Sequence, residues 1–140
     1  MRVLIDTCVI IDGLEKREPF WRSARDIFYQ AASQRAGFFL TAKSVTDIFY
    51  LEYRRIHDSS QTRDVISRLL KLFWVVDTTA ADISSALLKE APDYEDAVMM
   101  ETAFREKMDC IITRNIRHFQ NARIPVMTPE EFLSITEENH

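Results

Sequence analysis

The chain has 140 residues, a formal net charge of −4, and 46% hydrophobic and 29% charged residues. This length suits one domain with a substantial core, and the composition is that of a globular protein. Because the chain contains only two glycines, it has no glycine-rich loop of the kinds that cradle nucleotide phosphates.

No stretch approaches the roughly 20 apolar residues of a membrane span. The apolar run at the N-terminus is short and is interrupted by Asp6, which argues against a signal peptide. Cys8 and Cys110 both lie beside or within apolar, strand-like runs. We therefore expect reduced, buried thiols in a cytoplasmic protein with no membrane contact.

Short apolar runs alternate along the chain with segments whose apolar residues recur every three to four positions. The runs predict strands at 3–5, 38–40, 74–76 and 110–112 and a weaker one near 126. The first helices are expected from Thr7 or Cys8 to about Leu14 with a stop at Gly13, from Pro19 to a stop at Gly37, and from a Thr41 cap. The later helices are expected from a Ser60 cap to Phe73, from Thr78–Thr79, from Pro92–Asp93 to about Lys107, and from Thr128–Pro129.

Strands that alternate with helices predict an α/β domain with a mostly parallel sheet and right-handed crossovers. The sequence contains no repeat, linker or low-complexity segment. We therefore expect one domain over residues 1–136, followed by a disordered tail over residues 137–140.

Asp6 directly follows the first predicted strand, at the edge where open α/β sheets place their ligands. A carboxylate next to a buried strand is costly unless it has partners. We interpret Asp6 as the centre of an acidic metal site. The alternative is that Asp6 caps the turn that begins at Thr7.

Three further acids could join Asp6. Asp47 lies within two turns of the start of its predicted helix. It could join the metal site with Asp6, or it could be a solvated carboxylate on the helix surface. Asp93 and Asp96 are three residues apart and share one helix face, although both also suit the cap and first turn of a helix. Glu52 lies on another face than Asp47, so we expect it at the surface or in a salt bridge.

The residues after the fourth predicted strand are also polar. Thr113 and Asn115 lie, like Asp6, at the carboxyl end of a strand, or else cap the turn that follows. Several basic residues could contact phosphates or could be ordinary surface charges, namely Arg114 and Arg117 here and Lys43, Arg54 and Arg55 on the helix of Asp47. We expect His118 to be a surface or packing residue.

Together these stretches resemble the PIN domain, a family of metal-dependent nucleases. Residues 6–11 look like the family's opening Asp-Thr/Ser-x-Val/Ile motif. Residues 41–47 match the spacing of its second motif, with Asp47 where Glu is usual. Residues 96–99 look like the third motif, with Asp93 as an extra acid before it, and residues 112–119 resemble the closing Thr-x-Asp/Asn-x-x-x-Phe motif.

The resemblance implies a three-layer α/β/α fold with a central parallel sheet in the order 3-2-1-4-5. It also implies an endoribonuclease that uses Mg²⁺ or Mn²⁺, often the toxin of a toxin–antitoxin pair, with an antitoxin partner and a homodimeric state. The site expected from it has Asp6, Asp47 and Asp96 as catalytic acids, Asp6, Asp93 and Asp96 as metal ligands, Thr7, Thr113 and Asn115 as supporting groups, and Arg114 and Arg117 as substrate contacts.

The chain departs from the family pattern where a fourth acid is usual. Asn115 takes one candidate position and His118 takes another. Because an amide brings no charge, a second metal would be held more weakly. The alternative function is therefore a degenerate PIN-like domain that binds RNA or a protein partner without cutting.

Two other enzyme classes fail on single positions. A haloacid-dehalogenase-like phosphatase needs a second Asp two residues after the first, where this chain has Cys8. A cysteine-dependent phosphatase needs an Arg six residues after Cys8, where this chain has Leu14. Both classes are disfavoured.

Overall fold

The computed structural model describes residues 1–33 and 36–138. Its core is a five-stranded sheet in the order β3-β2-β1-β4-β5, and every neighbouring pair is parallel. The strand order predicted from the sequence is confirmed. The strands are β1 (Arg2–Ile5), β2 (Gly37–Thr41), β3 (Trp74–Val76), β4 (Cys110–Ile112) and β5 (Val126–Met127).

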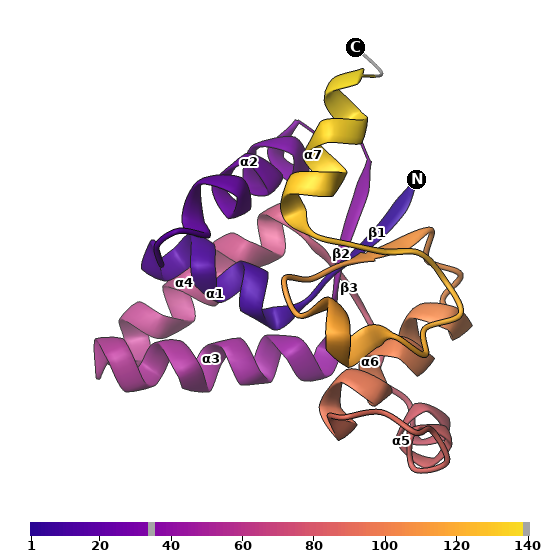
Figure 1. Ribbon diagram of the computed structural model, residues 1–140. Helices are drawn as coiled ribbons and strands as arrows, with labels where there is room; N and C mark the ends of the chain where they lie inside the picture. Colours follow the sequence, from indigo (N-terminus) through magenta and orange to yellow (C-terminus); the bar gives the residue numbers. More distant parts are fainter. Residues whose placement is uncertain (34–35, 139–140) are drawn as a thin grey trace.

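Helices cover both faces of the sheet, which gives the predicted three layers (Figure 1). One layer holds α1, α2, α3, α4 and α7, and the other holds α5, α6 and the short 3₁₀ helix η1. Within the described residues, none of the helices combines the length and the hydropathy needed to cross a membrane. The helices are α1 (Thr7–Glu15), α2 (Trp21–Ala32), α3 (Ala42–Ile56), α4 (Ser59–Leu72), α5 (Ala80–Ala86), α6 (Tyr94–Arg105), η1 (Ile116–Phe119) and α7 (Pro129–Glu138).

The central strand β1 contributes to the core on each side of the sheet. Val3 and Ile5 pack into the core beneath α1, α2 and α3, whereas Leu4 packs into the core beneath α6. All three side chains are fully buried. Because successive side chains of a strand point to opposite faces, an uninterrupted apolar run is what a strand covered on both sides requires.

Several helix boundaries differ from the prediction. The Thr41 cap of α3 is confirmed, since its hydroxyl accepts a hydrogen bond from the Ser44 N–H at 3.0 Å. The predicted Ser60 cap is wrong, because Asp58 caps α4 by accepting from the Gln61 N–H at 2.9 Å. Asp58 is favoured because its carboxylate reaches the third N–H of the helix.

Both glycines have roles other than the predicted helix stops. Gly37 is the first residue of β2, not the end of a helix. Gly13 lies inside α1, where a Cβ would come within 2.9 Å of the Phe28 ring, so it permits α1 and α2 to pack closely. The helix ends instead at Lys16, which adopts the left-handed conformation with a φ of 53°.

The C-terminal helix is longer than expected. It runs to Glu138, so the predicted tail includes two helical residues at 137–138. The remaining residues of that tail, 139–140, lie outside the described residues. The acidic first turn of α7 and the Thr128 hydroxyl, which accepts from the Glu131 N–H, agree with the predicted helix start.

A buried ion pair joins α5 to α6. The Arg105 guanidinium donates to both oxygens of Asp82 at 2.9 Å, and the Thr102 hydroxyl donates to the same carboxylate at 3.0 Å. Asp82 also accepts from the Thr79 N–H, which completes a capping box. Burial opposes the ionisation of Asp82, but the hydrogen bonds from Arg105, Thr79 and Thr102 outweigh it and lower the pKa to about 2.

We predict that Arg105→Met lowers the free energy of unfolding at pH 7 by about 2 kcal/mol, the value that follows from lowering the Asp82 pKa from 3.8 to about 2. Solvent screening of the partly exposed Arg105 makes this an upper value. Because the Asp82 pKa is depressed in the folded state, this stability is present above about pH 4 and is lost as the pH falls toward 2. Urea unfolding should therefore show a smaller difference at pH 3 than at pH 7.

The control is Arg22→Met, which removes an exposed pair with Glu18 and should change the stability little at either pH. A difference between wild type and Arg105→Met that is the same at pH 3 and pH 7 would contradict the assignment to Asp82.

Candidate active site

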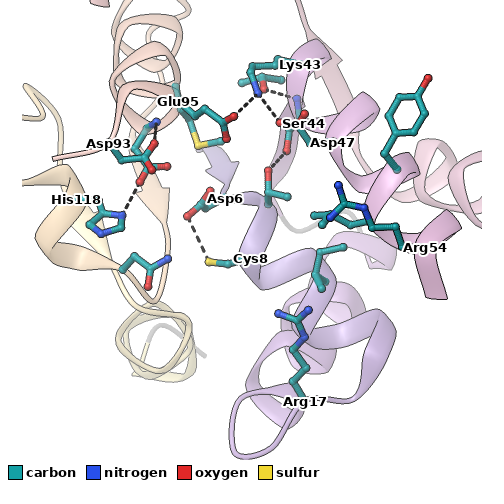
Figure 2. Close-up of a pocket in the computed structure, with 18 residues that line it drawn as sticks. Asp6, Cys8, Arg17, Lys43, Ser44, Asp47, Arg54, Asp93, Glu95 and His118 are labelled. Atoms are coloured by element: carbon teal, nitrogen blue, oxygen red, sulfur yellow. Dashed lines mark hydrogen bonds and ion pairs between the residues drawn. The ribbon is translucent and has the colours of Figure 1, made fainter. Parts of the chain in front are cut away.

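A pocket of about 460 Å³ opens at the carboxyl edge of the sheet (Figure 2). Its walls come from α1 and the residue Arg17 just after it, from most of α3, from the start of α6, and from the segment that follows β4. The parallel sheet brings these segments together because all of its strands end at the same edge. Of the predicted site residues, Asp6, Thr7, Asp47, Asp93, Asp96 and Asn115 line this pocket.

Asp6 lies at the centre of the pocket and is 5% exposed. Its Oδ2 accepts hydrogen bonds from the Thr113 hydroxyl at 2.7 Å and the Cys8 thiol at 3.3 Å. The side chain makes no capping hydrogen bond to α1, so the capping alternative is wrong. Burial raises the pKa of Asp6 above its usual range, although the bonds from Thr113 and Cys8 act in the opposite direction.

Asp93 and Asp96 come from the first turn of α6, on the wall beside Asp6. Asp93 caps this helix, with its Oδ1 accepting from the Asp96 N–H at 3.0 Å. The Oδ2 of Asp96 lies 2.8 Å from Nδ1 of His118. Ligand-type atoms of Asp93, Asp96 and His118 all lie within 4.8 Å of one another. The spacing of Asp93 and Asp96 therefore serves both a helix start and an acidic cluster.

The carboxylates of this cluster repel one another. Burial and the nearby Asp6 carboxylate raise the pKa of Asp96 to about 6, and the hydrogen bond from His118 only partly offsets them. A second carboxylate, that of Asp93, acts in the same direction as Asp6. Because like charges at short range disfavour ionisation, a cation bound among these groups would restore their charged forms.

Asp47 lies on the opposite wall and is paired. Its Oδ2 accepts from Lys43 Nζ at 2.6 Å, and the same ammonium lies 3.5 Å from Glu95 Oε1. Partial burial lowers the pKa of Lys43, but the Asp47 and Glu95 carboxylates outweigh it and the net shift is upward. Lys43 thus bridges α3 to α6 across the pocket. The Asp47 carboxylate therefore lies in the pocket already paired with the Lys43 ammonium.

Hydroxyl groups connect the remaining predicted residues. The side-chain oxygens of Thr7 and Ser44 lie 2.6 Å apart and link the start of α1 to that of α3. Thr113 is buried and accepts from the Asn115 N–H at 3.0 Å while it donates to Asp6. Of these contacts, the Thr113 hydrogen bond fixes the direction of the Asp6 carboxylate, whereas the Thr7–Ser44 contact holds α1 against α3.

The two predicted phosphate contacts have different surroundings. The Arg114 guanidinium donates to both oxygens of buried Asp12, at 2.7 and 3.2 Å, and stacks 4.3 Å from the centre of the Phe20 ring. It is therefore committed to packing against α1 and does not line the main pocket. Arg117 is exposed on η1, beside the pocket.

Sequence reasoning missed several residues of the site. Arg17 and Arg54 line the pocket on the side away from Asp93 and His118 (Figure 2). Arg17 carries no local sequence signal, because it reaches the pocket only through the packing of α1 against α3. Arg54 was indicated by the sequence as a possible phosphate contact, since it follows Asp47 on the same helix. His118 was predicted to be a surface or packing residue, yet it contacts Asp96. Its place in the closing motif was the available signal.

Besides Asp82, the acids Glu52 and Asp12 are also buried outside the pocket. Glu52 was expected at the surface or in a salt bridge, and the salt bridge is confirmed, since its Oε1 accepts from Arg55 at 2.9 Å. The side chain is fully buried, which the sequence did not indicate. Asp12, which lies within the apolar run of α1, is likewise buried against Arg114.

Cys8 lines the pocket but is unsuited to act as a nucleophile. Burial and the adjacent Asp6 carboxylate raise the pKa of its thiol to about 12. A cysteine nucleophile reacts as the thiolate, which this environment disfavours. Cys8 therefore serves here as a hydrogen-bond donor to Asp6.

The sequence matches the PIN domain family over residues 2–117. The chain belongs to the PIN domain family. No curated protein matches it significantly in sequence. The four acids and the closing Thr113–Asn115 segment of this PIN domain thus lie in one region of the fold, as the resemblance implied.

Several solved structures share this fold. A toxin–antitoxin complex from Klebsiella pneumoniae is 23% identical, with a TM-score of 0.65, over 91% of this chain and 97% of that one. FitAcB from Neisseria gonorrhoeae is 20% identical, with a TM-score of 0.67, over 91% and 98%. A VapC toxin from Mycobacterium tuberculosis that cleaves the sarcin–ricin loop is 15% identical, with a TM-score of 0.61, over 78% and 86%.

We predict that Asp96→Asn stabilises the metal-free protein at pH 7. A pKa raised from 3.8 to about 6 in the folded state means that the contribution of Asp96 is favourable at low pH and is lost as the pH rises through 6. Removing the charge should raise the free energy of unfolding by about 3 kcal/mol in EDTA at pH 7, and most of the gain should disappear near pH 4.

Urea unfolding at both pH values measures this effect. The matched control is Asp64→Asn, on the exposed surface of α4, which should leave the stability within about 0.5 kcal/mol of wild type. An Asp96→Asn variant that is less stable than wild type at pH 7 without metal would contradict the account of repulsion within the cluster.

Proposed function

We propose that this protein is a divalent-metal-dependent endoribonuclease that hydrolyses RNA phosphodiester bonds. The observation that carries the proposal is the convergence of Asp6, Asp93 and Asp96 in one partly buried pocket. Carboxylates held this close are unfavourable without a cation. Family membership supports a nuclease, because the three acids lie within the residues 2–117 that match the PIN domain.

The donor set fits Mg²⁺ or Mn²⁺, because both ions bind carboxylate oxygens. Asp6, Asp93 and Asp96 would hold the ion, with Asp47 on the facing wall. Bound there, such an ion lowers the pKa of a water and offsets charge on the phosphate and the leaving oxygen.

The protein's own groups would orient the site and the substrate. Thr113 and Cys8 fix the Asp6 carboxylate through Oδ2. Asn115 lines the pocket and could orient a water or the substrate through its amide. Lys43, which bridges Asp47 and Glu95, is placed to contact a substrate phosphate.

Exposed arginines would bind the flanking phosphates of the RNA. Arg17 and Arg54 line the pocket and Arg117 lies beside it, so these three form the proposed phosphate contacts. Arg114 is left out of this set, although the sequence suggested it, because its guanidinium is held by Asp12.

We further propose that the protein is the toxin of a toxin–antitoxin pair. The supporting observation is that proteins of this fold include a toxin–antitoxin complex from Klebsiella pneumoniae and a DNA-bound VapBC complex from Salmonella typhimurium. An antitoxin protein would then be its partner, and the toxin would act on cytoplasmic RNA as a homodimer.

A second candidate is a PIN domain that binds RNA or a protein without cutting. The observation that favours it is the character of the wall that follows β4, where Asn115 brings no charge and His118 already engages Asp96. A weakly held ion would leave the fold intact and the chemistry slow.

Cleavage of labelled RNA separates the two candidates. The purified protein is incubated with RNA in Mn²⁺, in Mg²⁺ and in EDTA, alongside Asp6→Asn and Asp96→Asn. We expect metal-dependent cleavage that falls at least about 100-fold in each variant, as when a group that stabilises transition-state charge is lost. Asp64→Asn, on the exposed face of α4, should cleave like wild type.

Equal cleavage by wild type and both site variants would identify a contaminating nuclease and contradict the assignment. Binding of the RNA with no cleavage in either metal, for an RNA panel that includes single-stranded and structured substrates, would favour the second candidate.

A further inference from the structure

His118 places an imidazole in the acidic cluster. The helix η1 carries this side chain to the start of α6, where Nδ1 lies 2.8 Å from Oδ2 of Asp96. Figure 2 shows His118 and Asp93 on the same side of the pocket, facing Asp6. The ring is partly exposed and Asp96 is largely buried, at 41% and 15% of their side-chain surfaces. The imidazole therefore closes the solvent side of the cluster.

The donor atoms are close enough to share one ion. The ligand atoms of Asp93, Asp96 and His118 all lie within 4.8 Å of one another. Two donors to one ion with bonds of about 2.1 Å are at most about 4.2 Å apart. Side-chain movements of a few tenths of an ångström would bring the distances between all three donor atoms within that limit.

The donor chemistry then decides which ion is preferred. Mg²⁺ is a hard cation that selects oxygen ligands and keeps several of its waters. Imidazole nitrogen suits first-row transition ions, and the affinity of mixed nitrogen and oxygen sites rises from Mn²⁺ along that row. A carboxylate site that also contains one imidazole should therefore discriminate against Mg²⁺ more strongly than a site made of carboxylates alone.

We propose that His118 supplies a nitrogen ligand to the ion held by Asp93 and Asp96, and that this pocket consequently selects a first-row transition ion, with Mn²⁺ as the probe, over Mg²⁺. The inference rests on the proposed function, since it names the cofactor of that same site. It makes His118 a metal ligand, whereas the alternative role is a hydrogen bond that only orients the Asp96 carboxylate.

Metal affinities test the selectivity without any RNA. Calorimetry gives the dissociation constants of Mn²⁺ and Mg²⁺ for wild type, His118→Asp and His118→Gln. His118→Asp replaces the nitrogen by carboxylate oxygen, so it tightens the binding of both ions, and the ratio of the two constants is the informative quantity. We expect the preference for Mn²⁺ over Mg²⁺ to fall at least about 10-fold in each variant.

Electron spin-echo spectroscopy of the Mn²⁺ complex tests the ligand itself. A coordinated imidazole gives a ¹⁴N coupling, which should be present in wild type and lost in His118→Gln. The matched control is His57→Gln, at the exposed end of α3, which should keep the signal. Circular dichroism and urea unfolding in EDTA establish that each variant is folded before its affinities are compared.

The results separate this inference from the proposed function. Binding of both ions with an unchanged affinity ratio and no ¹⁴N coupling would overturn the role of His118 and leave the nuclease proposal standing. Failure of both Mn²⁺ and Mg²⁺ to bind the folded wild type would overturn both the role of His118 and the metal-dependent nuclease proposal. The supporting result has two parts. The preference for Mn²⁺ over Mg²⁺ falls in both His118 variants, and the ¹⁴N coupling is lost in His118→Gln but kept in His57→Gln.

Discussion

The structure around the pocket depends on offsetting the energetic cost of a buried carboxylate, that of Asp6, at the end of the central strand. Asp6 follows β1, which has a hydrogen-bonded strand on each side and helices on both faces, so its carboxylate has little access to water. Thr113 and Cys8 offset part of that cost by hydrogen bonding to Oδ2. The acids at the start of α6 add to the cost, because their charges repel that of Asp6. A divalent cation would offset these penalties together.

Charge is divided unequally between the walls of the pocket. One wall carries Asp93 and Asp96 with a single imidazole, whereas Arg17 and Arg54 lie on the other side. Lys43 spans the gap through its contacts with Asp47 and Glu95. A polyanion could approach such a pocket from the side of Arg17 and Arg54. Its reacting phosphate could come close to the acidic wall only if a cation were bound at that wall. The proposed reaction would therefore need a cation at the acidic wall of the pocket.

The fold could be predicted from the sequence because its signals are local. Apolar runs at residues 3–5, 38–40 and 110–112 mark strands covered on both faces, and a parallel sheet brings the residues that follow them to one edge. The burial of Glu52 and the pairing of Asp12 with Arg114 could not be predicted in the same way. Both depend on how α1 packs against other segments, which the periodicity of a single helix does not encode. The contact of His118 with Asp96 is likewise tertiary, since 22 positions separate them.

The central claim is that the acidic cluster is a divalent-metal site. The most direct measurement is anomalous diffraction from crystals of the protein grown with Mn²⁺. The account predicts a manganese peak within bonding distance, about 2.2 Å, of Asp96 and at least one further donor from Asp6, Asp93 or His118. A fully ordered pocket that contains no manganese at a saturating concentration, with Asp96 still hydrogen bonded to His118, would contradict it.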